Sequence, residues 1–230
     1  MMWLYALLPP GDEPPPALGP GAAGEPLSVI DLPTAGLRAL VGRPGSRIPV
    51  AADTLRAHDE AVRRVAAAAQ ATLPARFGQT APDEAALDAA LAPRASAFAA
   101  ALERVRDCEQ MTLRLFGPPS APEDPHPAGP GAELGPGARY LAGRRARAAA
   151  TPPALTALLE RLAPLVREAR LERTAPGPAG PGPQLLASVY QLVPRAQLTA
   201  YRAAFDAHPA PAAPHRITLS GPWPPYAFAP

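Results

Sequence analysis

The sequence contains no lysine and no asparagine, and it has a single cysteine among its 230 residues. The missing lysine excludes a Walker A nucleotide-binding loop, in which a lysine contacts the phosphates. A single cysteine excludes a disulfide framework and fits a reducing compartment. The four histidines are dispersed and show no zinc-ligand spacing. We therefore expect neither a metal nor another cofactor.

Charge and hydropathy narrow the class of protein further. The formal net charge is only +2, which gives little reason to expect a nucleic-acid partner. No stretch approaches the roughly 20 apolar residues of a membrane span, and the N-terminus lacks the charged region of a secretory signal. We therefore predict a soluble, cytoplasmic protein with no nucleic-acid and no membrane partner.

The densest basic cluster leaves two interpretations open. It consists of Arg139, Arg144, Arg145 and Arg147, beside Tyr140. Such a cluster can bind nucleic acid or an acidic partner, but it is more often the solvated face of a helix.

Proline and glycine, with 35 and 18 residues, divide the chain into segments. Residues 117–137 are the best linker candidate, because proline and glycine dominate there and almost nothing is apolar. The fold class predicted on either side is α+β. The expected division is an N-terminal domain at 1–116, the linker at 117–137, a C-terminal domain at 138–220 and a tail at 221–230.

Hydrophobic periodicity predicts the individual elements. Strands are expected at 2–8, 27–32, 37–41, 110–116, 185–193 and 217–220. Helices are expected after a cap at Asp53 or Thr54, after a capping box at 80–83, after Pro93, and at 138–150, 153–171 and 196–207. The first helix has an apolar stripe of Leu55, His58, Val62, Val65, Ala66 and Ala69. Pro164 is expected to kink or split the helix at 153–171.

Few side chains are candidates for catalysis. His58, next to Asp59 and Glu60, has the residue types of a general base oriented by a carboxylate. We favour the structural alternative, a partly buried histidine that hydrogen-bonds to a neighbouring strand. Cys108 has no histidine or cationic group near it in sequence, which favours a small core residue over a nucleophile.

Arg76 follows Pro74 and precedes Phe77 and Gly78, where it could stack or clamp a carboxylate, although the composition is that of an ordinary turn. An enzyme would need His58, Glu60, Arg76 and Glu109 to converge in one pocket. No motif predicts that convergence, and no constellation in the sequence reaches the standard of an active site.

The last ten residues are unusual because they combine aromatic side chains with prolines. Three of the twelve aromatic residues of the chain lie there, among four prolines. Proline excludes a helix interior or a central strand, so we expect a stiff polyproline-II-like ribbon. Aromatic side chains favour burial, so this tail is expected to dock, and we predict that it closes the second domain.

This tail and a second segment resemble a known family. GPWPPYAF at 221–228 is similar to the closing GPWPPYSF signature of the gas vesicle protein GvpF/GvpL family, and LPARFG at 73–78 is similar to its LPxRFG. Further segments occur in the order that the family shows, and the resemblance covers essentially the whole chain. The positions that carry it are Tyr5, His58, Pro74, Arg76, Phe77, Gly78, Glu109, Tyr140, Gly221, Pro222, Trp223, Pro224, Pro225, Tyr226 and Phe228.

The resemblance implies an accessory or minor structural protein that is not an enzyme and that supports gas vesicle nucleation and assembly. It implies two α+β domains, of which the C-terminal one is a modified ferredoxin-like unit. The implied partners are the hydrophobic shell protein GvpA and other gas vesicle accessory proteins. The implied location is the cytoplasmic gas vesicle, with the gas-facing surface as one position.

The sequence also departs from the family pattern. Ala6 stands where a glycine is usual, Ala227 stands where a serine is usual, and the segment 79–82 lacks the expected phenylalanine. These differences leave the choice between an F-like and an L-like paralogue open. The alternative function is a protein-interaction module outside gas vesicles, with the tail as a proline-rich ligand.

Overall fold

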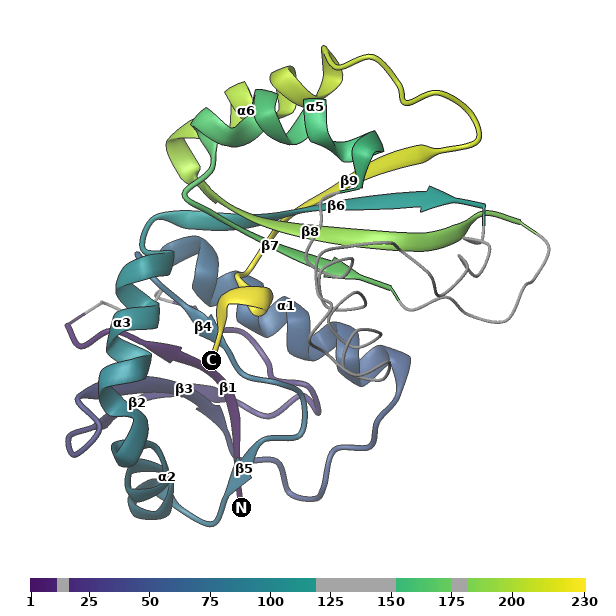
Figure 1. Ribbon diagram of the computed structural model, residues 1–230. Helices are drawn as coiled ribbons and strands as arrows, with labels where there is room; N and C mark the ends of the chain where they lie inside the picture. Colours follow the sequence, from purple (N-terminus) through teal and green to yellow (C-terminus); the bar gives the residue numbers. More distant parts are fainter. Residues whose placement is uncertain (12–16, 119–151, 175–181) are drawn as a thin grey trace, which may run out of the picture. The chain divides into compact units, whose positions relative to one another are not determined.

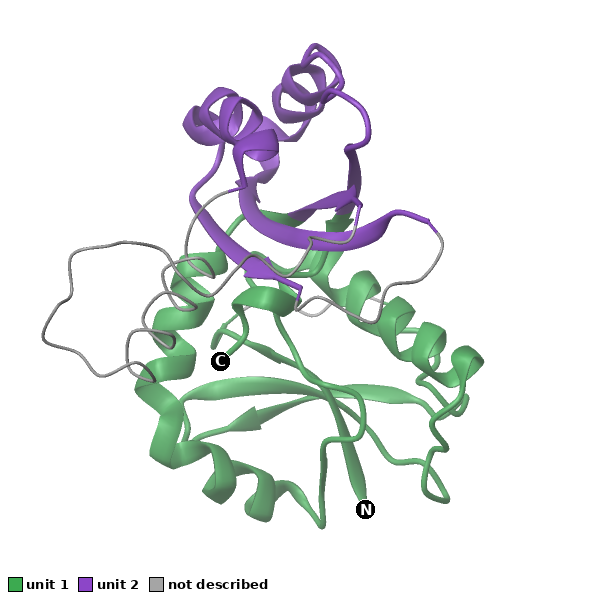
Figure 2. Cartoon of the chain, turned by 45° about the vertical axis from the view of Figure 1, so that its right-hand side comes forward, with its two compact units in different colours: residues 1–110, 222–230 green, residues 111–221 purple. Residues whose placement is uncertain are grey.

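The structure is a computed structural model that describes residues 1–11, 17–118, 152–174 and 182–230. Its internal contacts divide the chain into two compact units (Figure 2). Unit 1 comprises Met1–Gln110 and Pro222–Pro230, and unit 2 comprises Met111–Gly221. Apart from residues 117 and 118, the expected linker lies outside the described residues, as do the expected helix at 138–150 and the basic cluster with Tyr140.

Unit 1 is built on an antiparallel sheet with the strand order β2-β3-β1-β4, and β5 also pairs with β1 (Figure 1). The three longer strands, β1, β2 and β3, were all predicted from short apolar runs bounded by proline or glycine. The strands are β1 (Met2–Leu8), β2 (Leu27–Leu32), β3 (Leu37–Gly42), β4 (Leu73–Pro74) and β5 (Thr80–Ala81). Strand β1 is the centre of this sheet, because it pairs with β3, β4 and β5.

Every residue of β1 is buried, so both faces of this strand are covered. A register shift between Leu4 and Ala6 indicates a β-bulge. It places Tyr5 and Ala6 together in the cluster that packs against helix α1 (Ala52–Ala68). Leu4 and Leu7 instead line a pocket with residues of the later helices. The bulge thus assigns the side chains of β1 to two different apolar layers.

Helix α1 confirms the predicted amphipathic helix but not its cap or its full stripe. Its N-cap is Ala51, and Thr54 Oγ1 accepts a hydrogen bond from the Ala51 N–H at 3.1 Å. Thr54 therefore acts from the third helical position, as the partner residue of a capping box does. The prediction that Leu55 lies on the buried face is wrong, since it is 42% exposed and the buried face begins at His58.

Two further helices follow β5, as Pro93 predicted. They are α2 (Glu84–Leu91) and α3 (Ala95–Val105), separated by the 3₁₀ turn η1 (Ala92–Arg94). The N-cap of α2 is Asp83, which accepts a hydrogen bond from the Ala86 N–H at 2.8 Å. The expected capping box is therefore wrong, because Thr80 is held in the pairing of β5 with β1.

By length and hydropathy alone, Glu84–Val105 is one candidate membrane span. The stretch is interrupted by η1, and Phe98, Leu102 and Val105 of α3 are buried in the fold. Only 28% of this window is buried, so the helices bury one face and expose the other.

Unit 2 contains a second sheet with the strand order β7-β8-β6-β9. Its elements along the chain are β6 (Cys108–Gly117), α5 (Pro153–Leu162), η2 (Ala163–Leu165), β7 (Glu168–Arg173), β8 (Gln184–Pro194), η3 (Arg195–Gln197), α6 (Leu198–Asp206) and β9 (Arg216–Trp223). Its core combines buried residues of the sheet with one face of each helix: Met111, Leu113, Leu115, Leu155, Leu158, Leu162, Ala187, Val189, Val193 and Tyr201.

Two predictions about this region need correction. Strand β6 was assigned to the first domain with a boundary after residue 116, but it pairs within the second sheet, and the contact division falls after Gln110. The helix expected at 153–171 is too long, although the break expected at Pro164 is present. Pro164 ends the helical segment in η2, and the chain continues as the strand β7.

The tail is neither a single ribbon nor part of the second domain. Strand β9 runs through Trp223 at the edge of its sheet, where Pro222 is tolerated, and a 3₁₀ turn η4 (Tyr226–Phe228) follows. Residues Pro222–Pro230 belong to unit 1. The expectation that the tail closes the second domain is therefore wrong, because its buried aromatic contacts are made with unit 1.

One buried hydrogen bond of unit 2 provides a test of the core. The Tyr201 hydroxyl donates to Gln191 Oε1 in the interior of the unit. Replacement of Tyr201 by phenylalanine would leave this oxygen without its donor, so we expect the free energy of unfolding to fall by about 1–3 kcal/mol. Tyr190→Phe is the matched control, because its hydroxyl donates to Glu172 at an exposed position. Thermal unfolding followed by circular dichroism measures both, and equal effects would contradict the assignment.

Candidate functional site

The family-signature positions of the first domain converge on a cluster of rings in unit 1. His58 stacks on Tyr5, with ring centroids 4.8 Å apart, and meets the edge of Phe77 at 5.5 Å. Trp3 contacts Phe77 at 5.0 Å in an edge-to-face arrangement. Strand β1, helix α1 and the segment after β4 thus each contribute to one aromatic core.

Both ring nitrogens of His58 are engaged. Trp3 Nε1–H donates to His58 Nδ1 at 3.3 Å, and His58 Nε2 lies 3.2 Å from the Ala75 carbonyl oxygen. Because an indole only donates and a carbonyl only accepts, these partners define the neutral tautomer with its proton on Nε2. Burial lowers the pKa of His58, and this effect outweighs the Ala75 carbonyl, Asp59 and Glu25, which raise it. His58 is therefore a structural histidine, as the favoured interpretation of the sequence predicted.

Tyr5 extends this cluster to the loop before β2. Its hydroxyl donates to Glu25 Oε1 and accepts from the Ala22 N–H at 2.7 Å. Burial raises the pKa of Tyr5 above its usual range. Gly21 and Gly42 leave the space that the Glu25 side chain occupies, since a Cβ at either position would lie within 2.6 Å of Glu25 Oε1.

The tail joins the same cluster through helix α1. The Tyr226 hydroxyl donates to Asp59 Oδ1 at 3.0 Å, and Asp59 also accepts from Arg63 Nε at 2.6 Å. The Arg63 guanidinium lies over the Trp223 ring, 4.1 Å from its centroid. Burial raises the pKa of Tyr226, with a further contribution from Asp59. Both signature aromatics are therefore fixed by one turn of α1.

The end of the tail is held by its backbone. The Ala227 N–H donates to Gln110 Oε1 at 2.8 Å, and Arg104 Nη2 donates to the Phe228 carbonyl oxygen at 3.1 Å. The Phe228 side chain is completely buried. These contacts argue against a tail that is presented freely as a ligand for a partner.

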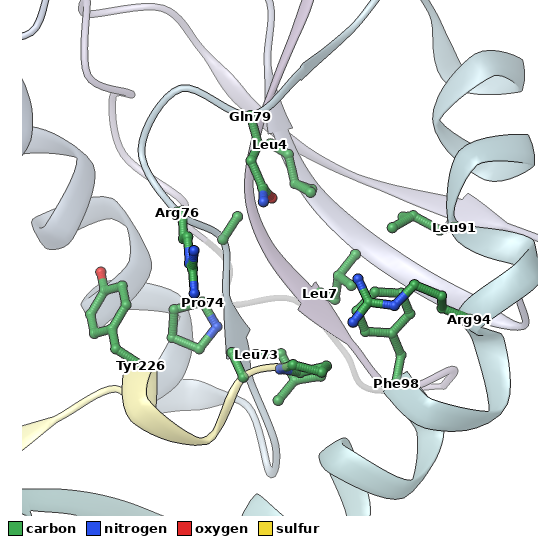
Figure 3. Close-up of a pocket in the computed structure, with 13 residues that line it drawn as sticks. Leu4, Leu7, Leu73, Pro74, Arg76, Gln79, Leu91, Arg94, Phe98 and Tyr226 are labelled. Carbon is green, nitrogen blue, oxygen red and sulfur yellow. The ribbon is translucent and has the colours of Figure 1, made fainter. Parts of the chain in front are cut away.

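A small pocket lies beside this region, lined by Pro74 and Arg76 of the LPARFG segment and by Tyr226 of the tail (Figure 3). Its volume is about 120 Å³. Of the four residues required for an enzyme, only Arg76 lines it; His58, Glu60 and Glu109 do not. The described residues contain no group of histidine, cysteine and acidic side chains that could hold a metal ion.

The remaining signature positions lie outside the aromatic cluster. Gly78 has a φ of 95°, a conformation that favours glycine in this turn. Glu109 lies in β6, and Gly221 ends the chain segment of unit 2, where its carbonyl oxygen accepts from Arg202 Nη2 at 2.6 Å. Cys108 is a buried cysteine of β6, as expected for a core residue.

All 230 residues, 1–230, match the family model of the gas vesicle synthesis protein GvpL/GvpF. The chain belongs to the GvpL/GvpF family. Family membership gives it a role in gas vesicles, in association with other gas vesicle proteins, and confirms what the two signature segments predicted. GvpL/GvpF is a structural gas vesicle family rather than a known enzyme family.

Two crystal structures show the same fold. GvpF from Anabaena sp. PCC7120 is similar with a TM-score of 0.68 and 16% sequence identity over 100% of this chain and 95% of that chain. GvpF from Microcystis aeruginosa is similar with a TM-score of 0.67 and 17% identity over 100% of this chain and 98% of that chain. No curated protein matches the sequence.

Sequence reasoning missed several partners of the signature residues. Trp3, Glu25 and Asp59 each bind a signature side chain, and Gln110 binds the tail backbone. Of these four, only Asp59 could be suspected from the sequence, because it directly follows His58 on α1. The other three come from segments that no local pattern relates to the signature.

The buried His58 predicts a pH dependence of stability. Because its pKa in the folded state lies below the ordinary value of 6.5, the unfolded chain binds more protons. This contribution is present above pH 6.5 and is lost as the pH falls through the folded-state pKa. His58→Gln cannot titrate, so its unfolding free energy should change less than the wild type between pH 7 and pH 5. It should also be lower at pH 7, by about 1–3 kcal/mol.

Denaturant unfolding followed by tryptophan fluorescence is a suitable measurement, because both tryptophans, Trp3 and Trp223, lie in unit 1. Parallel pH profiles for the variant and the wild type would show that His58 does not titrate with folding.

The buried tail predicts a second effect that the same measurement can detect. Phe228→Ala removes a completely buried ring, and we expect the free energy of unfolding of unit 1 to fall by about 3–5 kcal/mol. Pro230→Ala, at an exposed position of the same tail, should change it by less than about 0.5 kcal/mol. Unchanged stability in Phe228→Ala would restore the interpretation of the tail as a free ligand.

Proposed function

We propose that this chain supports gas vesicle nucleation and assembly by binding the hydrophobic shell protein GvpA, as a minor structural or accessory protein without enzymatic activity. The observation that carries the proposal is the match of all 230 residues to the GvpL/GvpF family. The docking of the tail supports a role for the folded surface, because Phe228 is completely buried and the Tyr226 hydroxyl is bonded to Asp59, which leaves the tail unavailable as an extended ligand. The alternative function, a protein-interaction module outside gas vesicles, is disfavoured for the same reason, because its ligand would be the tail.

The second unit supports the fold that the resemblance implied. Its described elements follow the order strand, helix, strand, strand, helix, strand, and β7 and β8 are antiparallel. This order and the sheet order β7-β8-β6-β9 are those of a ferredoxin-like unit. We therefore assign a ferredoxin-like architecture to unit 2 as part of the proposal.

An edge strand of unit 1 is the surface that we propose for shell binding. Among the described residues, β2 pairs with β3 alone, so it is an edge strand of its sheet. Its sequence, LSVIDL, is mostly apolar. An extended segment of a hydrophobic partner can add to such an edge, with main-chain hydrogen bonds providing affinity. Covering a strand of the shell protein in this way would also limit its aggregation before assembly.

Co-purification with the shell protein tests the proposal. We expect the full chain to retain the shell protein after co-expression and cross-linking. Ile30→Lys places a charge on β2, a common natural protection of sheet edges, and should reduce the retained fraction at least several-fold. Leu55→Lys is the control, because Leu55 is an exposed apolar residue of α1 outside the sheet.

The results distinguish a wrong function from a wrong binding surface. If the wild-type chain retains no shell protein, the proposed function is wrong. If Ile30→Lys retains as much as Leu55→Lys and both variants unfold at the wild-type temperature, shell binding uses a surface other than β2.

A further inference from the structure

The pocket of unit 1 combines an apolar wall with two arginines. Leu4 and Leu7 of β1 and Phe98 of α3 contribute apolar side chains to its lining (Figure 3). Its volume of about 120 Å³ is far below the several hundred cubic ångströms of sites for drug-sized ligands. The pocket is therefore of a size that suits one or two side chains of a partner rather than a cofactor.

The charged side chains that line this pocket are all basic. Arg76, after β4, and Arg94, in η1, lie on opposite sides of it (Figure 3). No acidic residue is among the thirteen that line it, all of which are described. The salt bridges found among the described residues involve neither arginine. Both side chains are exposed, so a partner can reach them without a change in the core.

One arginine is already oriented by its neighbour. The Arg94 guanidinium lies over the Phe98 ring, 4.9 Å from the centroid. A guanidinium that stacks on a ring keeps its N–H groups at the edge, where they can pair with a carboxylate. The apolar wall begins at the same ring, so a carboxylate on Arg94 would place a neighbouring residue near Leu4 and Leu7.

We propose that this pocket binds a peptide segment of a partner protein in which a glutamate or aspartate lies next to an aliphatic residue. The carboxylate pairs with Arg76 and Arg94, and the aliphatic side chain packs against Leu7 and Phe98. Charge complementarity identifies the acidic component, and the apolar wall distinguishes a peptide from an inorganic anion. The lining contains no residue of β2, so this inference is independent of the shell-binding edge proposed above.

The pocket of unit 1 is lined in part by residues of the tail. Tyr226, Ala229 and Pro230 belong to its lining, although they are more than 100 residues away from the other lining residues in sequence. The pocket is therefore complete only when the tail is docked. A chain whose tail is not docked would not bind the acidic segment.

Titration of the ¹⁵N-labelled full chain with two short peptides tests the proposal. The probes are acetyl-Leu-Glu-Leu-amide and its neutral counterpart acetyl-Leu-Gln-Leu-amide. We expect saturable shifts of the Arg76 and Arg94 Nε–H resonances with the acidic peptide, with a dissociation constant on the order of millimolar, because a site of this size engages few groups. The neutral peptide should bind roughly 3- to 10-fold more weakly, and the difference should shrink at high salt.

Variants assign the effect to the two arginines. Arg76→Gln and Arg94→Gln should each weaken the acidic peptide roughly 3- to 10-fold, and Arg76→Lys should fall between Arg76→Gln and the wild type because it keeps the charge but loses the bidentate geometry. Arg56→Gln, an exposed arginine of α1 outside the pocket, should leave binding unchanged. Wild-type unfolding temperatures verify that each variant is folded.

Four results would overturn the inference. They are equal binding of both peptides, the absence of saturable shifts up to about 20 mM peptide, an equal loss in Arg56→Gln, and inorganic phosphate that binds as tightly as the acidic peptide. The last result would identify a simple anion site instead of a peptide pocket.

Discussion

The buried imidazole of His58 joins three segments that are distant in sequence. It accepts a hydrogen bond from Trp3 in β1 and lies within hydrogen-bond distance of the Ala75 carbonyl oxygen after β4, while α1 carries it. A buried ring that satisfies both nitrogens in this way tolerates few alternatives, because loss of either partner leaves a polar atom without a bond in the core. The arrangement of β1, α1 and the LPARFG turn in unit 1 depends on this one group.

The tail is bound to the same helix through Asp59, the residue that follows His58. Asp59 accepts hydrogen bonds from Tyr226 and Arg63, and the Arg63 guanidinium lies over the Trp223 ring. The two family signatures, more than 140 residues apart in sequence, are thus parts of one structural assembly. A signature can consequently identify a family by preserving contacts within a core.

Local patterns in the sequence predicted much of the fold, including β1, β2, β3, α1 and the restart at Pro93. The predictions failed where distant contacts decide the structure. Strand β6 alternates equally well for either sheet, so its sequence does not reveal that its partners are β8 and β9. The tail was expected to dock for a sound reason, its aromatic content, but which unit receives it depends on Asp59, Gln110 and Arg104. The structural role of His58 could be predicted because it lies on an apolar stripe, whereas Trp3 as its partner could not.

Unit 2 is an insertion in the chain of unit 1, since residues 111–221 lie between the two parts of that unit. During synthesis, the first 110 residues leave the ribosome long before the nine that complete their core. At about 5–20 residues per second, the intervening residues take on the order of 5–20 seconds to make. Throughout that interval, the site of Phe228 and the apolar surface around it are open to solvent and to other nascent chains. A chaperone or an early assembly partner that covers this surface would therefore act on the growing chain, before the finished protein exists.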